Sequence, residues 1–436
     1  MRLGESGDAS RLDCPRRNDL MRIIMFYHSI VSDWNHGNAH FLRGIVTELG
    51  KRGHQVSVYE PKNGWSYSNM LLEKGEHVLR QFEEAYPGLY GIPYRLDLLN
   101  LDEALSQADL VIVHEWNEHE LVRRVGAHRK RHDHFRLLFH DTHHRSVTDA
   151  AAMHAYDLSG FDGVLAYGGT IRDIYLAKGW ANRVWLWHEA ADIRVFRPLE
   201  PAAKVGDVVW IGNWGDDERS DEIREFFVEP VKRLGLKGMV YGVRYPKHAL
   251  ELLQEAGIGY GGWLPNFAVP EVFNRFRLTV HIPRRPYVTA LPGIPTIRPF
   301  EALACGIPLI SAPWEESESL FSPGLDFVFA GDADEMEQQM RSLLDNPQKA
   351  KRLASHGHET ILARHTCSHR IDELLEICRE LGMTALHSCR GSGRLIATGM
   401  PPLEIVPSLC GSANSGQTDK EVFTLMQKID ANGKKG

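Results

Sequence analysis

Apolar residues occur along most of the chain in short uninterrupted runs, separated by longer segments in which they recur every three or four positions. Short apolar runs are typical of strands buried on both faces of a parallel sheet, and the longer segments are typical of covering helices. Strands are predicted in the first half of the chain at residues 22–27, 55–59, 109–114, 136–140, 163–166 and 184–187. The second half repeats the pattern at 207–211, 238–241, 259–263, 278–282, 308–311 and 326–329. The pattern therefore predicts an α/β protein with two Rossmann-like domains, and one continuous sheet is the alternative.

The two sets of predicted strands are separated by a segment with Pro198 and Pro201, which interrupt regular structure. We therefore expect a hinge linker over residues 191–204, between a first domain at 21–190 and a second at 205–382. Ligands bind beyond the carboxyl ends of the strands in open parallel sheets, so two facing domains predict one cleft between them.

Both ends of the chain lack this periodicity. Residues 1–20 are expected to be an extension outside the core. Residues 383–436 are rich in Gly, Ser and Pro and are expected to be a disordered tail. The alternative for this tail is a partner-binding segment.

Composition narrows the class of protein. The chain of 436 residues has 43% hydrophobic residues, 25% charged residues and a formal charge of -7, without the basic excess of a nucleic-acid-binding protein. The 6 cysteines form no Cys-x-x-Cys pair, which argues against a zinc site or a disulfide framework and favours a reducing, cytoplasmic environment. No signal sequence or membrane span is expected. The basic stretch 123–134 is expected to be a solvated helix face, with weak contact to an anionic membrane as the alternative.

The segment from Ile294 to Ala312 predicts a short helix followed by a buried strand. Thr296 can cap the helix and Gly306 can end it. Helical periodicity places Arg298 and Glu301 together on a face that differs from the apolar one. A carboxylate beside a helix start can accept bonds from the two hydroxyls of a ribose. The alternative is an i, i+3 ion pair between these two residues.

Polar residues also follow predicted strands of the first domain. His140 and Asp141 end the fourth strand and are candidates for orienting an acceptor hydroxyl, with hydrogen-bonded structural roles as the alternative. A metal site is not expected among residues 140–145, because no glutamate or cysteine completes a ligand set. Gly37 and Asn38 precede a predicted helix whose backbone N–H groups would face the cleft, or they form a plain helix cap.

In the second domain, Asn213 follows the first predicted strand and Arg219 lies in the first turn of the next helix. A cation opposes the helix dipole there, which an anionic ligand explains better than stability does. Arg244 and Arg284 follow later strands and are further candidates for binding a diphosphate; surface charges are the alternative. The Gly-x-Gly-x-x-Gly match at 257–262 is rejected as a dinucleotide site, because a helix precedes it where a strand is required.

The run from Arg298 to Gly306, Arg-Pro-Phe-Glu-Ala-Leu-Ala-Cys-Gly, resembles the donor-binding segment of GT-B glycosyltransferases of the family-4 type (glycosyl transferases group 1). It is most similar to the CgeB-like spore-maturation branch. Similar segments at 52–56, 187–198 and 364–370 extend the resemblance over residues 21–380. In this family a glutamate at the position of Glu301 holds the donor ribose, and one eight positions earlier touches the transferred sugar. Gly293 stands at that earlier position, which leaves the donor open.

The resemblance implies a GT-B glycosyltransferase that binds a nucleoside-diphosphate sugar in the second domain and an acceptor in the first. It also implies retention at the anomeric carbon, without a metal or other cofactor. The acceptor stays open among saccharides, lipids, proteins and small molecules. The alternatives are a nucleotide-sugar 2-epimerase and a catalytically inactive protein that binds a sugar or a nucleotide.

Overall fold

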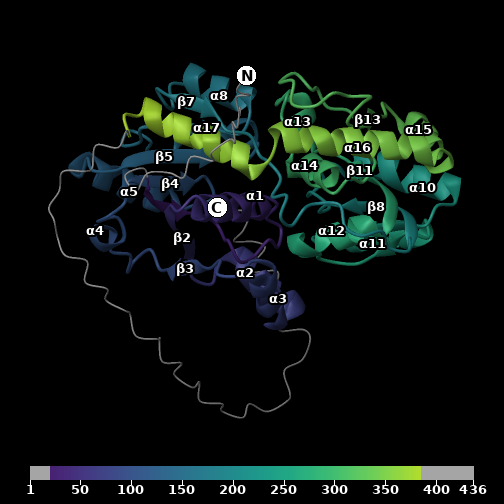
Figure 1. The fold of residues 1–436 in the computed structure, drawn as a ribbon, viewed down its shortest axis with the longest axis horizontal. Helices are drawn as coiled ribbons and strands as arrows, with labels where there is room; N and C mark the ends of the chain where they lie inside the picture. Colours follow the sequence, from purple (N-terminus) through teal and green to yellow (C-terminus); the bar gives the residue numbers. More distant parts are fainter. Residues whose placement is uncertain (1–19, 384–436) are drawn as a thin grey trace, which may run out of the picture. The chain divides into compact units, whose positions relative to one another are not determined.

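A computed structural model describes residues 20–383, which contain two separate parallel sheets (Figure 1). The prediction of an α/β protein with two Rossmann-like sheets is confirmed, and a single continuous sheet is excluded. The predicted N-terminal extension and C-terminal tail lie outside the described residues, apart from Leu20 and Met383.

The first sheet has seven strands in the order β3-β2-β1-β4-β5-β6-β7, and every adjacent pair is parallel. Its strands are β1 (Arg22–Phe26), β2 (Gln55–Pro61), β3 (Gly91–Tyr94), β4 (Leu110–His114), β5 (Arg136–Asp141), β6 (Gly163–Ala166) and β7 (Val184–Leu186). Only β3 was not predicted from the sequence. It is an edge strand containing Pro93, and proline fits an edge because it cannot donate a ladder hydrogen bond.

The helices of the first domain connect these strands. They are α1 (Ala39–Lys51), α2 (Trp65–Lys74), α3 (His77–Ala85), α4 (Leu101–Ala104), α5 (His119–Arg131), α6 (Arg145–Thr148), α7 (Ala150–His154) and α8 (Gly169–Ala177). None of the helices in residues 20–383 is both long enough and apolar enough to cross a membrane.

The second sheet has six parallel strands in the order β10-β9-β8-β11-β12-β13. Its strands are β8 (Gly206–Ile211), β9 (Gly238–Tyr241), β10 (Gly259–Tyr260), β11 (Phe276–His281), β12 (Leu309–Ser311) and β13 (Val328–Phe329). Its helices are α9 (Ser220–Ile223), α10 (Glu229–Leu234), α11 (Lys247–Glu255), α12 (Val269–Asn274), α13 (Arg285–Thr289), α14 (Ile297–Ala304), α15 (Ala333–Asp345) and α16 (Pro347–Arg364). A π-helical turn, η1 (Arg224–Val228), joins α9 to α10, and a 3-10 turn, η2 (Asn266–Ala268), precedes α12.

The last described helix, α17 (Cys367–Glu380), packs against α1 of the first domain, whereas α16 packs against α14 of the second (Figure 1). The approach of α17 to α1 is close at Gly44, where an added Cβ would lie 2.3 Å from Sγ of Cys367. A small residue is therefore required where the two helices cross. The exact domain limits stay a prediction.

Candidate functional site

The carboxyl ends of both sheets line one cleft, with a cavity of ≈ 350 Å³. In each sheet the central pair of strands, β1 with β4 and β8 with β11, is the point where the strand order reverses, and ligands of open α/β sheets bind there. Residues that follow strands of the first sheet and line the cleft include His36, Trp116, Thr142, His143, Tyr167 and Glu189.

Most of the site residues predicted from the sequence line this cleft. They are Gly37, Asn38, Asn213, Arg219, Arg244, Arg284, Thr296 and Arg298. His140, Asp141 and Glu301 are not among the lining residues. The predicted arginines converge because each follows a strand of one parallel sheet or begins a helix beside it.

Arg244 and Arg284 carry positive charge at the cleft and each pairs with one acid. Arg244 has a φ of 63°, lies over the Trp65 ring at 5.8 Å and pairs with Asp216 at 3.0 Å. Arg284 pairs with Glu218 at 2.8 Å. Burial acts against ionisation of Glu218, but the nearby His144 and the hydrogen bond from Arg284 outweigh it and lower its pKa to about 2.

Arg219 differs from its predicted setting. It is the N-cap residue of α9. Its guanidinium is already hydrogen-bonded, because it donates to the carbonyls of Asn213 and Ile282. It also lies 5.3 Å from the centre of the Trp210 ring. Burial, with the nearby charge of Arg284, lowers the pKa of Arg219 to about 9. Arg219 therefore combines a structural role with a cationic charge beside the cleft.

Glu301 is completely buried, so the expectation that it lies off the buried face of its helix is wrong. The face of α14 that carries Glu301 is also covered, because His40 of α1 packs against it. Nδ1 of His40 lies 2.9 Å from Oε1 of Glu301. Nε2 of His40 accepts the N–H of Asp192 at 2.8 Å, which places the proton on Nδ1 and makes His40 a donor to the carboxylate. The other carboxylate oxygen, Oε2, accepts from Arg298. The first domain, the linker and α14 thus meet at one buried carboxylate.

The predicted capping role of Thr296 at the start of α14 also needs correction. Thr296 is the N-cap residue, but its side chain makes no capping bond and lies 3.2 Å from Nε2 of His281 instead. Gly293 has a φ of 87°, and an added Cβ would lie 2.6 Å from Oγ of Ser317. Position 293 therefore has neither the space nor the backbone conformation for a larger side chain.

His140 and Asp141 lie at the end of β5 but behind the surface of the cleft. The Tyr27 hydroxyl lies 2.6 Å from Nδ1 of His140, and Tyr175 donates to Asp141 at 2.9 Å. Burial lowers the pKa of His140 to about 3 and raises that of Asp141 to about 6. Their catalytic role stays a prediction.

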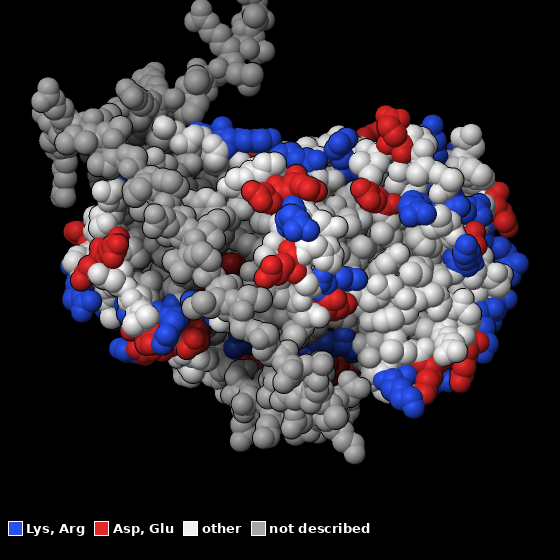
Figure 2. All heavy atoms as spheres, turned by 90° about the horizontal axis from the view of Figure 1, so that it is seen from below, with Lys and Arg blue, Asp and Glu red and all other residues white. Residues whose placement is uncertain are grey.

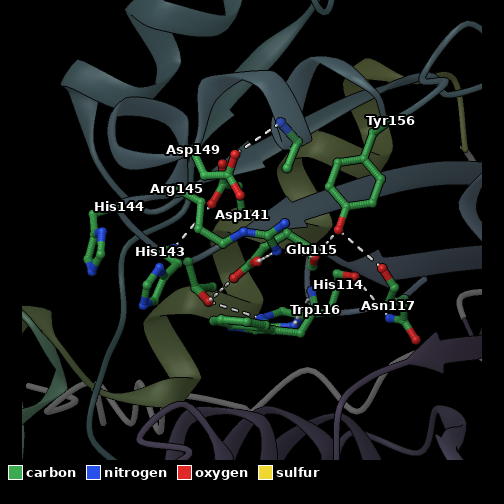
Figure 3. A network of polar contacts seen from close by, with 12 residues as sticks. His114, Glu115, Trp116, Asn117, Asp141, His143, His144, Arg145, Asp149 and Tyr156 are labelled. Carbon is green, nitrogen blue, oxygen red and sulfur yellow. Dashed lines mark hydrogen bonds and ion pairs between the residues drawn. The ribbon is translucent and has the colours of Figure 1, made fainter. Parts of the chain in front are cut away.

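Thr142 and His143, which follow directly, are the residues of this loop that reach the cleft. Thr142 accepts a hydrogen bond from Nδ2 of Asn38, which is the N-cap residue of α1 without a side-chain capping bond. In the same region the buried Glu115 pairs with Arg145 at 3.2 Å, and the guanidinium of Arg145 lies over the Trp116 ring (Figure 3). Two loops that follow neighbouring strands are therefore fixed to one another by a buried ion pair.

Four cleft residues that were not predicted have a buried polar atom without a hydrogen-bond partner among residues 20–383. These atoms are Nε2 of His36, Nδ1 of His143, the hydroxyl of Tyr167 and Oε2 of Glu189. Their positions in the sequence could have indicated them as cleft residues, because each follows a predicted strand of the first sheet. Glu189 lies two residues before the predicted linker and was not singled out as a site residue.

Within the described residues, one group has ligand atoms close enough together to hold a metal ion: Asp102, His128 and His132. These residues lie on α4, on α5 and directly after α5, and none lines the cleft. Residues 140–145 are not part of this group. The surface seen in Figure 2 carries basic and acidic side chains side by side.

Comparison with known proteins identifies a family over part of the chain. Residues 219–376 match a family described as "Glycosyl transferase-like". This region begins at Arg219 and extends into α17. A comparison with curated proteins finds no match.

Several solved structures share the arrangement of both domains. A glycosyltransferase from Rickettsia africae ESF-5 aligns with a TM-score of 0.59 at 12% identity, over 83% of this chain and 98% of that chain. Anabaena HepE in complex with UDP and glucose aligns with a TM-score of 0.58 at 13% identity, over 82% and 99%. An alpha-glucosyltransferase in complex with UDP and DNA aligns with a TM-score of 0.59 at 13% identity, over 83% and 100%. The chain therefore has the GT-B fold of these glycosyltransferases, and its residues 219–376 match the glycosyl transferase-like family.

Proposed function

We propose that the protein is a glycosyltransferase that transfers a sugar from a uridine-diphosphate sugar bound at the second domain to an acceptor bound at the first. The observation that carries this proposal is the convergence of four arginines, Arg219, Arg244, Arg284 and Arg298, on the interdomain cleft of a GT-B fold. Anabaena HepE and the alpha-glucosyltransferase, whose printed ligands include UDP, support the choice of uridine diphosphate.

The leaving group in such a transfer is a nucleoside diphosphate, and its negative charge grows as the bond to the sugar breaks. Positioned guanidinium groups stabilise that charge in a site from which water is partly excluded. Arg244 and Arg284 already pair with acids, which holds their side chains at the cleft before a ligand arrives. The charge needed for departure of the diphosphate is therefore supplied by the protein, and the proposed reaction uses no metal ion or other cofactor.

The acceptor is proposed to bind against the loops that follow β1, β4 and β5. His143 and Thr142 face that side, and His140 and Asp141 hold the loop from behind. We further propose retention at the anomeric carbon and membership of the CgeB-like branch, both on the resemblance of the segment around Glu301. Action in the cytoplasm is proposed on the pattern of the cysteines, which form no Cys-x-x-Cys pair. The acceptor class stays open among hydroxyl-bearing saccharides, lipids, proteins and small molecules.

Calorimetric titration with UDP and with uridine tests the donor site. Arg244→Ala is expected to weaken UDP binding roughly ten- to a hundredfold, because a charge-assisted hydrogen bond contributes about 1.5 to 3 kcal/mol, and to leave uridine binding unchanged. Arg285→Ala is the matched control, because Arg285 pairs with Glu222 and does not line the cleft. Failure of the wild-type protein to bind UDP would overturn the proposal.

Turnover separates this function from the alternatives. Incubation with uridine-diphosphate sugars should release UDP, slowly with water and faster with a suitable acceptor. A 2-epimerase would instead return an altered sugar that is still attached to the nucleotide. A binding protein without activity would return the ligand unchanged.

A further inference from the structure

Glu189 has one carboxyl oxygen that no residue in 20–383 hydrogen-bonds. It follows β7, lines the cleft and is 3% exposed, and its Oε2 accepts no hydrogen bond from any residue in 20–383. Burying a polar atom without a hydrogen bond costs stability. A bound ligand that donates to this oxygen would remove that cost.

The other unpartnered atoms of the cleft lie on the same domain as Glu189. They belong to His36, His143 and Tyr167, on the loops that follow β1, β5 and β6. Burial lowers the pKa of both imidazoles well below the ordinary value, so these side chains are neutral. Burial, and then the charge of Glu301, raises the pKa of Glu189 well above its ordinary value.

This wall of the cleft therefore offers donors and acceptors of hydrogen bonds without a strong positive charge. Such a surface suits the hydroxyl groups of a sugar, which both donate and accept, and it does not suit a phosphate. The cationic wall is formed by arginines of the second domain. The two walls thus divide the cleft into an anion-binding side and a hydroxyl-binding side.

Glu189 lines the same cavity as the four arginines of the second domain. Three residues further along the chain, the backbone N–H of Asp192 binds His40, which in turn donates to Glu301. Glu189 is also close enough to Glu301 for the two carboxyl groups to repel one another. A sugar attached to a diphosphate at the arginines would lie in the same cavity of ≈ 350 Å³ that Glu189 lines.

We propose that Glu189 binds hydroxyl groups of the sugar carried by the nucleotide donor, and so contributes to the selection of that sugar. This inference rests on the proposed function, because it requires the nucleotide to lie against the arginines. Glu189 is a binding and specificity residue here, and no bond is made or broken at its carboxyl group.

The test is calorimetric titration of the full-length protein with UDP and with UDP-glucose, UDP-galactose and UDP-N-acetylglucosamine. At least one of these sugar nucleotides is expected to bind the wild type more tightly than UDP. Glu189→Ala should reduce that affinity roughly ten- to a hundredfold and leave UDP unchanged. Glu189→Gln should keep most of the affinity, because an amide also donates and accepts hydrogen bonds.

Asp216→Asn provides a matched carboxylate-to-amide control. Asp216 lines the cleft beside Arg244, so this change should alter the affinities for UDP and for the sugar nucleotides by the same factor. Melting temperatures of all variants show whether each protein is folded. If Glu189→Ala does not fold, Glu189→Leu, which keeps a side chain of similar size but can neither donate nor accept hydrogen bonds, should lower the ratio of sugar-nucleotide affinity to UDP affinity in the same way.

Three results would overturn the inference. One is a Glu189→Ala protein that keeps the wild-type preference for the sugar nucleotide over UDP. Another is a Glu189→Ala protein whose affinities for UDP and for the sugar nucleotide fall by the same factor. A third is a wild-type protein that binds UDP but none of the sugars more tightly, which would leave the proposed donor site intact. Absence of UDP binding altogether would reject the proposed function together with this inference.

Discussion

Glu301 is surrounded by hydrogen-bond donors although it belongs to an apolar helix. His40 and Arg298 each bond one of its oxygens, and both bonds are buried or nearly so. An ionised carboxylate offers about four acceptor positions, so two occupied ones leave two for further donors. The ribose role that the resemblance implies stays a prediction, because Glu301 does not line the cleft and Arg298 stands between them.

We expect Glu301→Ala to lower both stability and nucleotide affinity. Removing one member of a buried ion pair costs about 3 to 5 kcal/mol, because the remaining charge stays buried. Melting temperature and UDP affinity are the measurements, with 2′,3′-dideoxy-UDP as the comparison ligand. Wild-type protein should prefer UDP over the dideoxy form, and the variant should hardly distinguish them. A destabilised variant that still distinguishes them would show that Glu301 serves the fold alone.

Glu189 makes stability depend on pH. Because its pKa is raised in the folded state, the folded protein keeps a proton that the unfolded chain releases above pH 4.5. This contribution to stability is complete below that pH and is lost as pH rises toward the folded-state pKa. Glu189→Gln removes the titrating group, so its melting temperature should rise relative to wild type as pH increases from 5 to 8. A difference that is constant over this range would contradict the assignment.

At the scale of helices and strands, the positions of the strands could be predicted because parallel strands are buried on both faces and form continuous apolar runs. All twelve predicted strands occur in the structure. β3 was missed because an edge strand is only half covered and its sequence, Gly-Ile-Pro-Tyr, has no long apolar run. The sequence pattern thus identifies central strands better than edge strands.

Residues of the candidate site could be predicted only where they directly follow a predicted strand. Arg244 and Arg284 reach the cleft because they follow β9 and β11, and this order is visible in the sequence. The burial of Glu301 could not be predicted, because its partner His40 lies 261 positions away and only the packing of the two domains brings them together. Glu189 was overlooked because prolines nearby indicated a linker, whereas the segment before them is buried.

The contact of α17 with α1 gives a prediction about packing. Gly44→Ala would place a Cβ 2.3 Å from Sγ of Cys367 and 3.0 Å from Cβ of Asp192, so we expect a loss of about 1 to 3 kcal/mol. Cys367→Ala removes the nearer atom and should recover part of that loss in the double variant. Urea unfolding of the four proteins measures the coupling. Additive effects would mean that the helices separate to accommodate the methyl group.

At the scale of the whole molecule, charge is distributed unevenly even though the surface seen in Figure 2 is mixed. Arginines from several loops of the second domain face the cleft, whereas its first-domain wall is mainly neutral. The net charge of -7 would by itself discourage an anionic ligand. The field that a nucleotide meets is therefore set locally by the cleft rather than by the molecule as a whole.

Because these arginines supply the positive charge, UDP affinity and turnover should survive EDTA treatment followed by removal of divalent ions. The measurement is UDP release before and after treatment, with magnesium, manganese and zinc added back separately. Asp102, His128 and His132 lie outside the cleft, so binding of an ion there should change thermal stability more than turnover. Strict recovery of turnover with one metal would contradict a metal-independent reaction.

The hydrogen bond from His40 to Glu301 limits how this protein could be recombined with others. A second domain joined to a foreign first domain would bury Glu301 without its histidine donor, even if every residue of the second domain were retained. Chimaeras should therefore bind nucleotide well only when the incoming first domain carries a histidine at the place of His40. The proposed donor site therefore depends on both domains, and we expect that neither can be exchanged as an independent module.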